Sequence, residues 1–279
     1  MDTRSKHSLR RCGAKLNQRF PRVINMRMNS KLRTIITNYQ DPNSWISRRR
    51  ARRVGPLLKI IRHVYGVNGK VRLIDLGGHR DYWNIISRDF LEQNKVSITL
   101  VNLPSNNAVQ DDNLFHHHTG DACNLTEFAN NSFDIVHSNS VIEHVGDWTR
   151  IKRFAKESRR LAPYHFIQTP YFWFPIEPHY LRAFHHWGPW PWRARRHFKH
   201  QASSRTDAHR IDVDQAMANI FLEPFLLDFR AFRFLFPDSA VHSERVLGIV
   251  IKSLIAVRAP IEEKSQFTNR GVADSQAGR

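Results

Sequence analysis

The sequence predicts an α/β fold in which helices cover both faces of a doubly wound, mainly parallel sheet. Short runs of apolar and β-branched residues recur between residues 70 and 170, and each run ends in residues typical of turns. Segments of helical length lie between these runs, and strands that alternate with helices form parallel sheets with crossover helices. The hydrophobic content of 41% over 279 residues is also enough for a sizeable core.

The predicted elements follow one another in regular order. Apolar residues at helical spacing predict a first helix within residues 45–65, and Pro56 suits the first turn of that helix. Five strands are predicted at residues 70–78, 96–103, 113–122, 133–140 and 164–170, with helices at 81–93 and 147–161 and a short helical piece near 123–130. One face of the 147–161 helix is apolar and is expected to pack on the sheet.

The chain changes in character after Pro170. Residues 169–201 are dense in aromatic residues, proline and histidine, and they show no clear period. Residues 212–232 then have the pattern of a helix, and residues 245–259 have that of a closing strand or hairpin.

The net charge of +18 is concentrated at the start of the chain. Residues 1–62 hold 17 of the 43 Lys and Arg residues and only two acids, so they carry +15 of that charge. Such a segment is either an arm for acidic surfaces, such as RNA or anionic lipid, or a solvated and partly disordered leader. We expect a basic arm over residues 1–44, a folded domain over 45–258 and a flexible tail over 259–279.

Two cysteines, Cys12 and Cys123, stand without metal-ligand spacing, which favours a reducing compartment. No run approaches the roughly 18 apolar residues of a membrane span. These observations predict a cytoplasmic protein without a transmembrane segment. Histidines at 116–118, 185–186, 197 and 200 occur without a metal-binding motif, so the expected chemistry needs no metal.

The segment "LIDLGGHRDY" at residues 73–82 places an acid and two glycines at the end of a predicted strand. Ligands of open α/β sheets bind beyond the carboxyl ends of the strands. Gly77 and Gly78 would let the backbone approach a ligand closely, and Asp75 would accept a hydrogen bond from an amino group. By itself, this pattern is more often only a tight turn between strand and helix.

Four segments in order, "VRLIDLGG", "ITLVNL", "GDACNL" and "FDIVHSNSVIEHV", resemble the class I S-adenosylmethionine-dependent methyltransferases. The later segments "TPYFWFPIEPHY" and "ERVLGIVIKSLIAVR" are similar to a bacterial branch associated with glycan and natural-product gene clusters. The resemblance covers residues 45–258. It implies a Rossmann-like seven-stranded sheet, an aromatic lid and acceptor region at 170–210 after the fifth strand, and S-adenosylmethionine as the cofactor.

The resemblance also implies roles for individual residues. The cofactor-binding set would be Asp75, Gly77, Gly78, Asn102, Asp121, Ala122, Asn139 and Ser140, with Glu143 and His144 near the methyl group. Asp121 would accept from the adenine amino group, and Asn139 and Ser140 would flank the methionine part. Two departures from the family pattern occur: His79 and Asp81 stand where further glycines are usual, and Asn102 replaces the usual ribose-binding acid.

The expected reaction is methyl transfer to a small-molecule or glycan acceptor at oxygen, which needs a base to take up a proton. The candidates for that base are His144, Glu177 and His179, each of which could instead be structural. The aromatic residues after Pro170 suit a sugar ring, although they could equally pack between lid and core. Two alternatives are an RNA methyltransferase that uses the basic arm and a non-enzymatic binding protein on the same fold.

Overall fold

The computed structural model describes residues 53–104, 111–177, 182–195, 217–218, 220, 223–246 and 248–260. The predicted arm over residues 1–44 and almost all of the predicted tail lie outside these residues. Of Glu177 the structure describes the backbone only.

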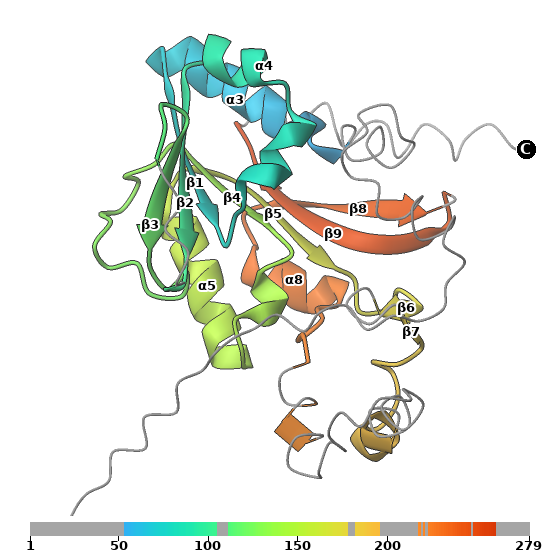
Figure 1. Cartoon of the computed structure of the whole chain (residues 1–279). Coiled ribbons are helices and arrows are strands. Elements are labelled where there is room, and N and C mark those ends of the chain that lie inside the picture. Colours follow the sequence, from blue (N-terminus) through green and yellow to red (C-terminus); the bar gives the residue numbers. More distant parts are fainter. Residues whose placement is uncertain are drawn as a thin grey trace, which may run out of the picture.

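A seven-stranded sheet with the order β3-β2-β1-β4-β5-β9-β8 forms the centre of the molecule (Figure 1). Its strands are β1 (Val71–Leu76), β2 (Val96–Asn102), β3 (Phe115–Thr119), β4 (Ile135–Asn139), β5 (Tyr164–Pro170), β8 (Ala240–Val246) and β9 (Val250–Arg258). Neighbours among β1 to β5 are parallel, whereas β9 is antiparallel to both β5 and β8. The predicted seven-stranded, mainly parallel sheet is confirmed. The segment 245–259, predicted as a closing strand or hairpin, contains β9, whereas β8 begins before it at Ala240.

Helices cover both faces of this sheet, as predicted. The α3 helix (Gly55–Asn68) and α4 (Arg88–Gln93) lie on one face, and α5 (Trp148–Leu161) and α8 (Phe229–Leu235) lie on the other (Figure 1). None of the helices in the described part of the chain is long and apolar enough to cross a bilayer.

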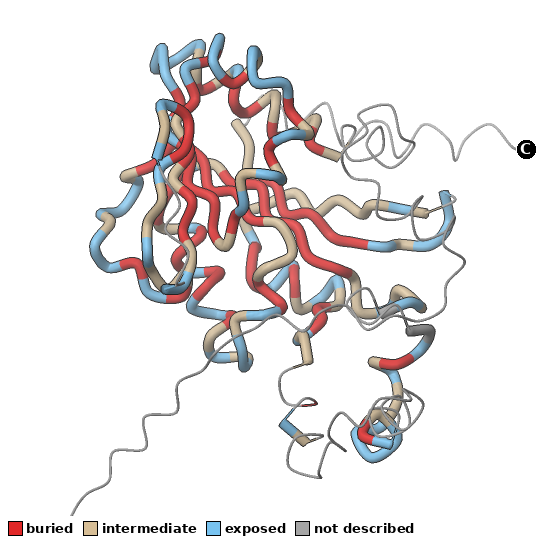
Figure 2. The backbone as a smooth tube through the Cα atoms, viewed as in Figure 1, coloured by how far each residue is buried: buried red, intermediate tan, exposed pale blue. Residues whose placement is uncertain are grey.

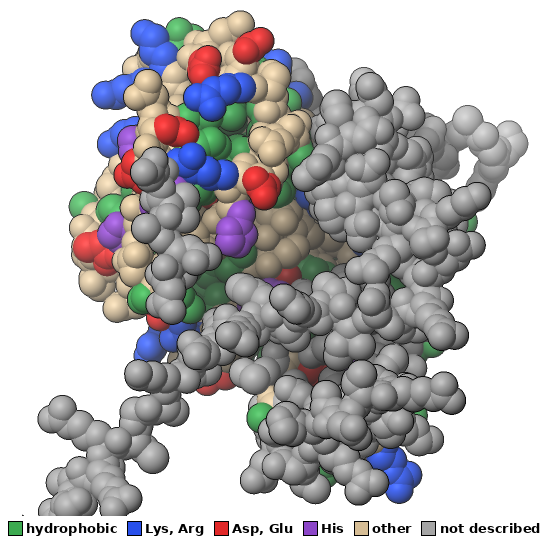
Figure 3. All heavy atoms as spheres, viewed as in Figure 1, with side chains coloured by type: hydrophobic (Ala, Val, Ile, Leu, Met, Phe, Trp, Pro, Cys, Tyr) green, Lys and Arg blue, Asp and Glu red, His purple; other side chains and the backbone are tan. Residues whose placement is uncertain are grey.

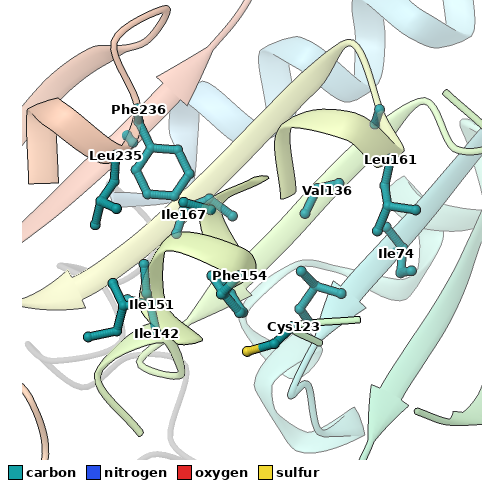
Figure 4. Packing of buried hydrophobic residues seen from close by; sticks show 14 of the residues in the cluster. Ile74, Cys123, Val136, Ile142, Ile151, Phe154, Leu161, Ile167, Leu235 and Phe236 are labelled. Carbon is teal, nitrogen blue, oxygen red and sulfur yellow. The ribbon is translucent and has the colours of Figure 1, made fainter. Parts of the chain in front are cut away.

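The α5 helix packs its apolar stripe directly on the centre of the sheet. Its side chains Phe154 and Leu161 are fully buried and meet Ile74 of β1, Val136 of β4 and Ile167 of β5 (Figure 4). Burying one such side chain contributes about 1.5–3 kcal/mol, so this face makes a large contribution to stability. The buried residues accordingly follow the central strands, and the outer turns of the helices are exposed (Figure 2).

The predicted helix over residues 81–93 is divided into two short elements. A 3-10 helix, η1 (Arg80–Ile85), is followed by α4, and Ser87 lies between them in an extended conformation. The Ser87 hydroxyl accepts from the Phe90 N–H at 3.3 Å and caps the start of α4. The prediction of one continuous helix was therefore wrong, because Ser87 is a good N-cap residue and a new helix starts after it.

Two other helix predictions also fail in part. Residues 123–130 form separate turns, closed by bonds between residues three apart: the Asn124 N–H donates to the Asp121 carbonyl at 2.7 Å and the Phe128 N–H to the Leu125 carbonyl at 3.1 Å. Within the predicted helix at 212–232, the described residues 223–227 are not helical, and α8 begins only after the Asp228 cap. Pro224, which lacks an N–H and restricts the preceding residue, explains the interruption.

His165 of β5 is completely buried beside the closing hairpin, and its Nε2 lies 2.7 Å from the Ser239 hydroxyl. Burial lowers the pKa of His165 to about 3, and the positive charge of Arg258 lowers it further. The unfolded chain binds this proton near pH 6.5, so stability falls as the pH decreases from 6.5 towards 3.

We expect His165→Gln to flatten this pH dependence by up to about 1.4 kcal/mol per pH unit between about pH 6 and pH 4. The measurement is the free energy of unfolding from urea titrations at a series of pH values. The control His116→Gln, at an exposed position of β3, should keep the wild-type slope. Equal slopes for wild type and His165→Gln would contradict the expectation.

Candidate active site

The carboxyl ends of β1 to β5 meet at one edge of the sheet, and the strand order reverses between β1 and β4. In doubly wound sheets a ligand binds in the crevice at this reversal. The structure brings the residues that sequence patterns assigned to a cofactor together along this edge: Asp75, Gly77, Gly78, Asn102, Asp121, Ala122, Asn139 and Ser140.

The loop after β1 needs its two glycines for reasons internal to the protein. Gly77 has a φ of +73°, and a Cβ there would lie 2.6 Å from a methyl group of Val141. A Cβ on Gly78 would lie 1.9 Å from Oδ2 of Asp75. Asn102, at the end of β2, donates from Nδ2 to the Gly78 carbonyl at 2.9 Å and ties the loop to the neighbouring strand.

Asp75 is only 1% exposed, and its carboxylate bonds to two buried side chains. Trp83 donates from Nε1 to Oδ2 at 2.9 Å, and Nδ1 of His137 lies 2.6 Å from Oδ1. Both oxygens therefore have internal partners, and this burial does not support the expected direct contact with a cofactor amino group. The carboxylate instead connects β1, η1 and β4 beneath the glycine loop.

The end of β4 offers a hydrogen-bond acceptor that the described residues leave unused. Ser140 has a φ of +57°, a conformation that costs about 1–3 kcal/mol for a residue other than glycine. Its hydroxyl donates to Oε1 of Gln168 at 2.9 Å, which holds the strained turn. Beside it, Oδ1 of Asn139 is buried, and none of the described residues donates a hydrogen bond to it. A ligand with an N–H or O–H group would satisfy this atom, so the residues present fit an amino-bearing cofactor.

Asp121 lies beyond the end of β3 and is tied to α5. Arg150 donates from one guanidinium nitrogen to both carboxylate oxygens at 2.9 Å, and the Cys123 N–H donates to Oδ1 at 3.0 Å. Partial burial by itself raises the pKa of Asp121, but these hydrogen bonds outweigh it and hold the pKa below its usual value. The side chain is therefore a fixed anion that can still accept a further hydrogen bond.

A short 3-10 helix after β4, η2 (Ile142–His144), carries the residues expected near the reacting atoms. Glu143 is 1% exposed, and its Oε2 accepts from the Thr169 hydroxyl at 3.1 Å. His144 is exposed on the surface, with its Nε2 4.0 Å from Oε1 of Glu143. Of the other two candidate bases, Glu177 belongs to β6 (Ile176–Glu177), and His179 lies outside the described residues.

A cavity of about 220 Å³ lies next to this helix and is lined by Phe172, His186, Arg193, Glu223, Pro224, Phe225 and Leu226. The Phe225 N–H donates to the Glu143 carbonyl at 2.8 Å, and the Phe172 N–H donates to the Leu227 carbonyl at 3.0 Å. These bonds attach the cavity to the ends of β4 and β5.

One wall of the cavity is a buried charged group. Glu223 forms an ion pair with Arg193 and lies 2.9 Å from Nε2 of His185. Sequence reasoning missed Glu223 and Phe225, because they lie within the predicted helix 212–232. Pro224 between them was the available signal that the chain leaves a helical path there.

One protein-family model matches part of the chain. Residues 88–163 match a family model described as a methyltransferase domain. None of the curated protein sequences matches the chain.

Similar solved structures include three bacterial and archaeal proteins. A candidate O-methyltransferase from Nostoc punctiforme has 12% identity and a TM-score of 0.38, and the match covers 73% of this chain and 56% of that one. A SAM-dependent methyltransferase from Methanosarcina mazei has 13% identity, coverage of 71% and 96%, and a TM-score of 0.42. An O-methyltransferase family protein from Burkholderia thailandensis has 12% identity, coverage of 83% and 68%, and a TM-score of 0.38.

This chain thus spans little more than half the length of the Nostoc protein. At 12–13% identity, these similarities do not identify a substrate for this chain.

Proposed function

We propose that this chain is a class I S-adenosylmethionine-dependent methyltransferase that transfers the methyl group of its cofactor to an oxygen atom of a small-molecule or glycan acceptor. When bound, S-adenosylmethionine supplies an electrophilic methyl group on its sulfonium. The observation that carries the acceptor proposal is the small cavity attached to η2, between the sheet edge and the segment 223–226. Residues 170–210 would form the lid and acceptor region.

The lining of the cavity supports an acceptor with a single ring that bears hydroxyl groups. Phe172 and Phe225 offer aromatic faces to a ring, and Arg193, Glu223 and His186 offer polar groups around it. A volume of about 220 Å³ lies below the roughly 300–1,000 Å³ of pockets that hold drug-sized ligands. A monosaccharide or a single aromatic ring therefore suits it better than a larger molecule.

The cofactor would lie along the edge where the strand order reverses. Oδ1 of Asn139 would accept from its amino group, Asp121 from the adenine, and the Ala122 N–H would donate to the ring. Asn102 would reach the ribose hydroxyls while it holds the Gly78 carbonyl. Gly77 and Gly78 would contribute through the shape of their loop, which Asp75 supports from beneath.

His144 is the base that this geometry supports best. Its side chain is accessible, and it follows directly on Glu143, whose backbone carbonyl bonds to the cavity residue Phe225. We propose that Nε2 of His144 takes the proton of the acceptor hydroxyl. The buried carboxylate of Glu143 would then stabilise the positive charge on the imidazole. Glu177 and His179 remain the other candidates.

For cofactor binding, we expect Asp121→Ala to weaken the affinity for S-adenosylmethionine about 10–150-fold, because a hydrogen bond to a carboxylate is lost. Isothermal titration calorimetry measures this change. The control Asp238→Ala removes a carboxylate that is also held by arginines but lies far from the sheet edge, beside α5 and β9. Equal affinities for Asp121→Ala and wild type would remove Asp121 from the cofactor site.

For the acceptor, the test is formation of S-adenosylhomocysteine with a panel of methyl glycosides, catechols and transfer RNA. We expect turnover with a ring-sized acceptor, and a KM for it that rises about tenfold or more in Phe225→Ala, because burial and ring contact are lost. The affinity for S-adenosylmethionine should stay unchanged in that variant.

Two outcomes would contradict the acceptor proposal. Turnover with transfer RNA alone would move the acceptor class to nucleic acid. A KM for the small acceptor that is equal in Phe225→Ala and wild type would exclude the cavity as its binding site.

A further inference from the structure

The lid exposes a set of large apolar side chains, which we call the lid face: Trp173, Ile176, Phe184, Trp187, Trp190 and Trp192. Their exposed fractions range from 38% to 55%. The ring of Trp187 lies 5.8 Å from that of Trp173 and 5.1 Å from that of Phe184, so at least these three form one continuous surface. A contiguous exposed apolar surface often marks an interaction site, whereas single exposed apolar residues are common on any protein and need no explanation.

The charge of the same segment is strongly one-sided. Residues 171–200 contain five Lys and Arg residues and a single acid, Glu177. Over α3 and α4, by contrast, basic and acidic side chains are intermixed (Figure 3). The sequence of this segment thus combines tryptophans with an excess of basic residues, of which Arg193 is paired with Glu223 and Arg195 is exposed. Such an excess complements a negatively charged partner.

The indole N–H of Trp187 already has a hydrogen-bond partner within the protein. Its Nε1 donates to the Phe172 carbonyl at 2.9 Å, so the indole ring could leave water without leaving its N–H unsatisfied. Nε2 of His186 lies 2.6 Å from the same carbonyl and fixes the backbone beneath the ring. The exposed Ile176 adds an aliphatic side chain, which can enter hydrocarbon but cannot stack on a nucleobase.

We propose that the lid face docks on the surface of a membrane that contains anionic lipids. Tryptophan favours the boundary between headgroups and hydrocarbon, and Lys and Arg near that boundary attract anionic headgroups. Phe172, His186 and Arg193 of the cavity belong to the same segment, so docking would bring the acceptor cavity to the lipid surface. The membrane interaction itself does not depend on methyl transfer.

The test is co-sedimentation of the full-length chain with vesicles of phosphatidylcholine alone and of phosphatidylcholine with phosphatidylglycerol. We expect binding to the anionic vesicles, and a loss of at least about tenfold in the partition coefficient of Trp173→Ala/Trp187→Ala. The matched control Val67→Ala/Phe234→Ala removes two side chains that are 70% and 66% exposed outside the lid, and it should bind like wild type. This comparison separates the lid from the basic residues 1–62, which all variants retain.

Vesicle binding equal in the Trp173→Ala/Trp187→Ala variant and wild type would overturn the proposal. So would a variant that keeps vesicle binding but loses binding to a single-stranded RNA oligonucleotide, since the lid face would then serve nucleic acid. Far-UV circular dichroism and titration with S-adenosylmethionine confirm that the variant is folded. Because vesicle binding is measured without an acceptor, failure here leaves the proposed methyl transfer unaffected.

Discussion

Replacing His144 by alanine is expected to lower the turnover number about 10²–10⁴-fold, the usual effect of losing a general base. The acceptor hydroxyl would keep its place in the cavity, but the imidazole proposed to take its proton, beside the buried carboxylate of Glu143, would be missing. The rate of S-adenosylhomocysteine release at saturating acceptor measures the change. The affinity for S-adenosylmethionine should stay at the wild-type value.

The control for this variant is His116→Ala, which removes an exposed histidine from β3 and should leave turnover unchanged. Full activity of His144→Ala on the true acceptor would exclude His144 as the base. In that case Glu177→Ala or His179→Ala should show the loss instead, since both lie in the loop after β5 that is expected to reach the acceptor. Activity in all three variants would leave proton uptake to water.

Asp75→Ala is expected to lower the free energy of unfolding by about 2–5 kcal/mol, because it leaves two buried polar partners without an acceptor. Nε1 of Trp83 and Nδ1 of His137 would both lose their bonds to this carboxylate in a site where water is excluded. Urea unfolding followed by circular dichroism measures the loss. The affinity for S-adenosylmethionine should also fall, because the glycine loop rests on this side chain.

The sequence offers a matched control in Asp111, which lies 2.9 Å from Nδ1 of His117 on the surface. The same substitution, Asp111→Ala, breaks the same type of pair where water can replace the lost partner, so the unfolding midpoint should not change measurably. If Asp75→Ala lowered the free energy of unfolding no more than Asp111→Ala does, the buried hydrogen bonds of Asp75 would not stabilise the fold. Direct contact of Asp75 with the cofactor would then regain support.

The strands, and with them the sheet edge where their carboxyl ends meet, could be predicted from the sequence because both depend on local patterns. Short apolar runs that are rich in β-branched residues and bounded by turn residues, such as 70–78 and 133–140, are typical of buried strands. Helix limits were less predictable, because one residue with a cap or a fixed φ, such as Ser87 or Pro224, outweighs the average propensity of its segment.

The composition of the site depended on contacts between distant parts of the chain. Asp75 and His137 are 62 residues apart and meet because β1 and β4 pair in a register that places them opposite each other. Glu143 and Phe225 likewise meet only once the segment before α8 returns to the end of β4.

The sequence by itself therefore determined the α/β fold, the order of its elements and the edge of the sheet where a cofactor would bind. Only the tertiary structure decided which polar groups at that edge already have hydrogen-bond partners within the protein. The carboxylate of Asp75 serves Trp83 and His137, whereas Oδ1 of Asn139 has no donor among the described residues. The physical reason is that strand pairing and burial, rather than residue type, determine which hydrogen bonds remain for a ligand.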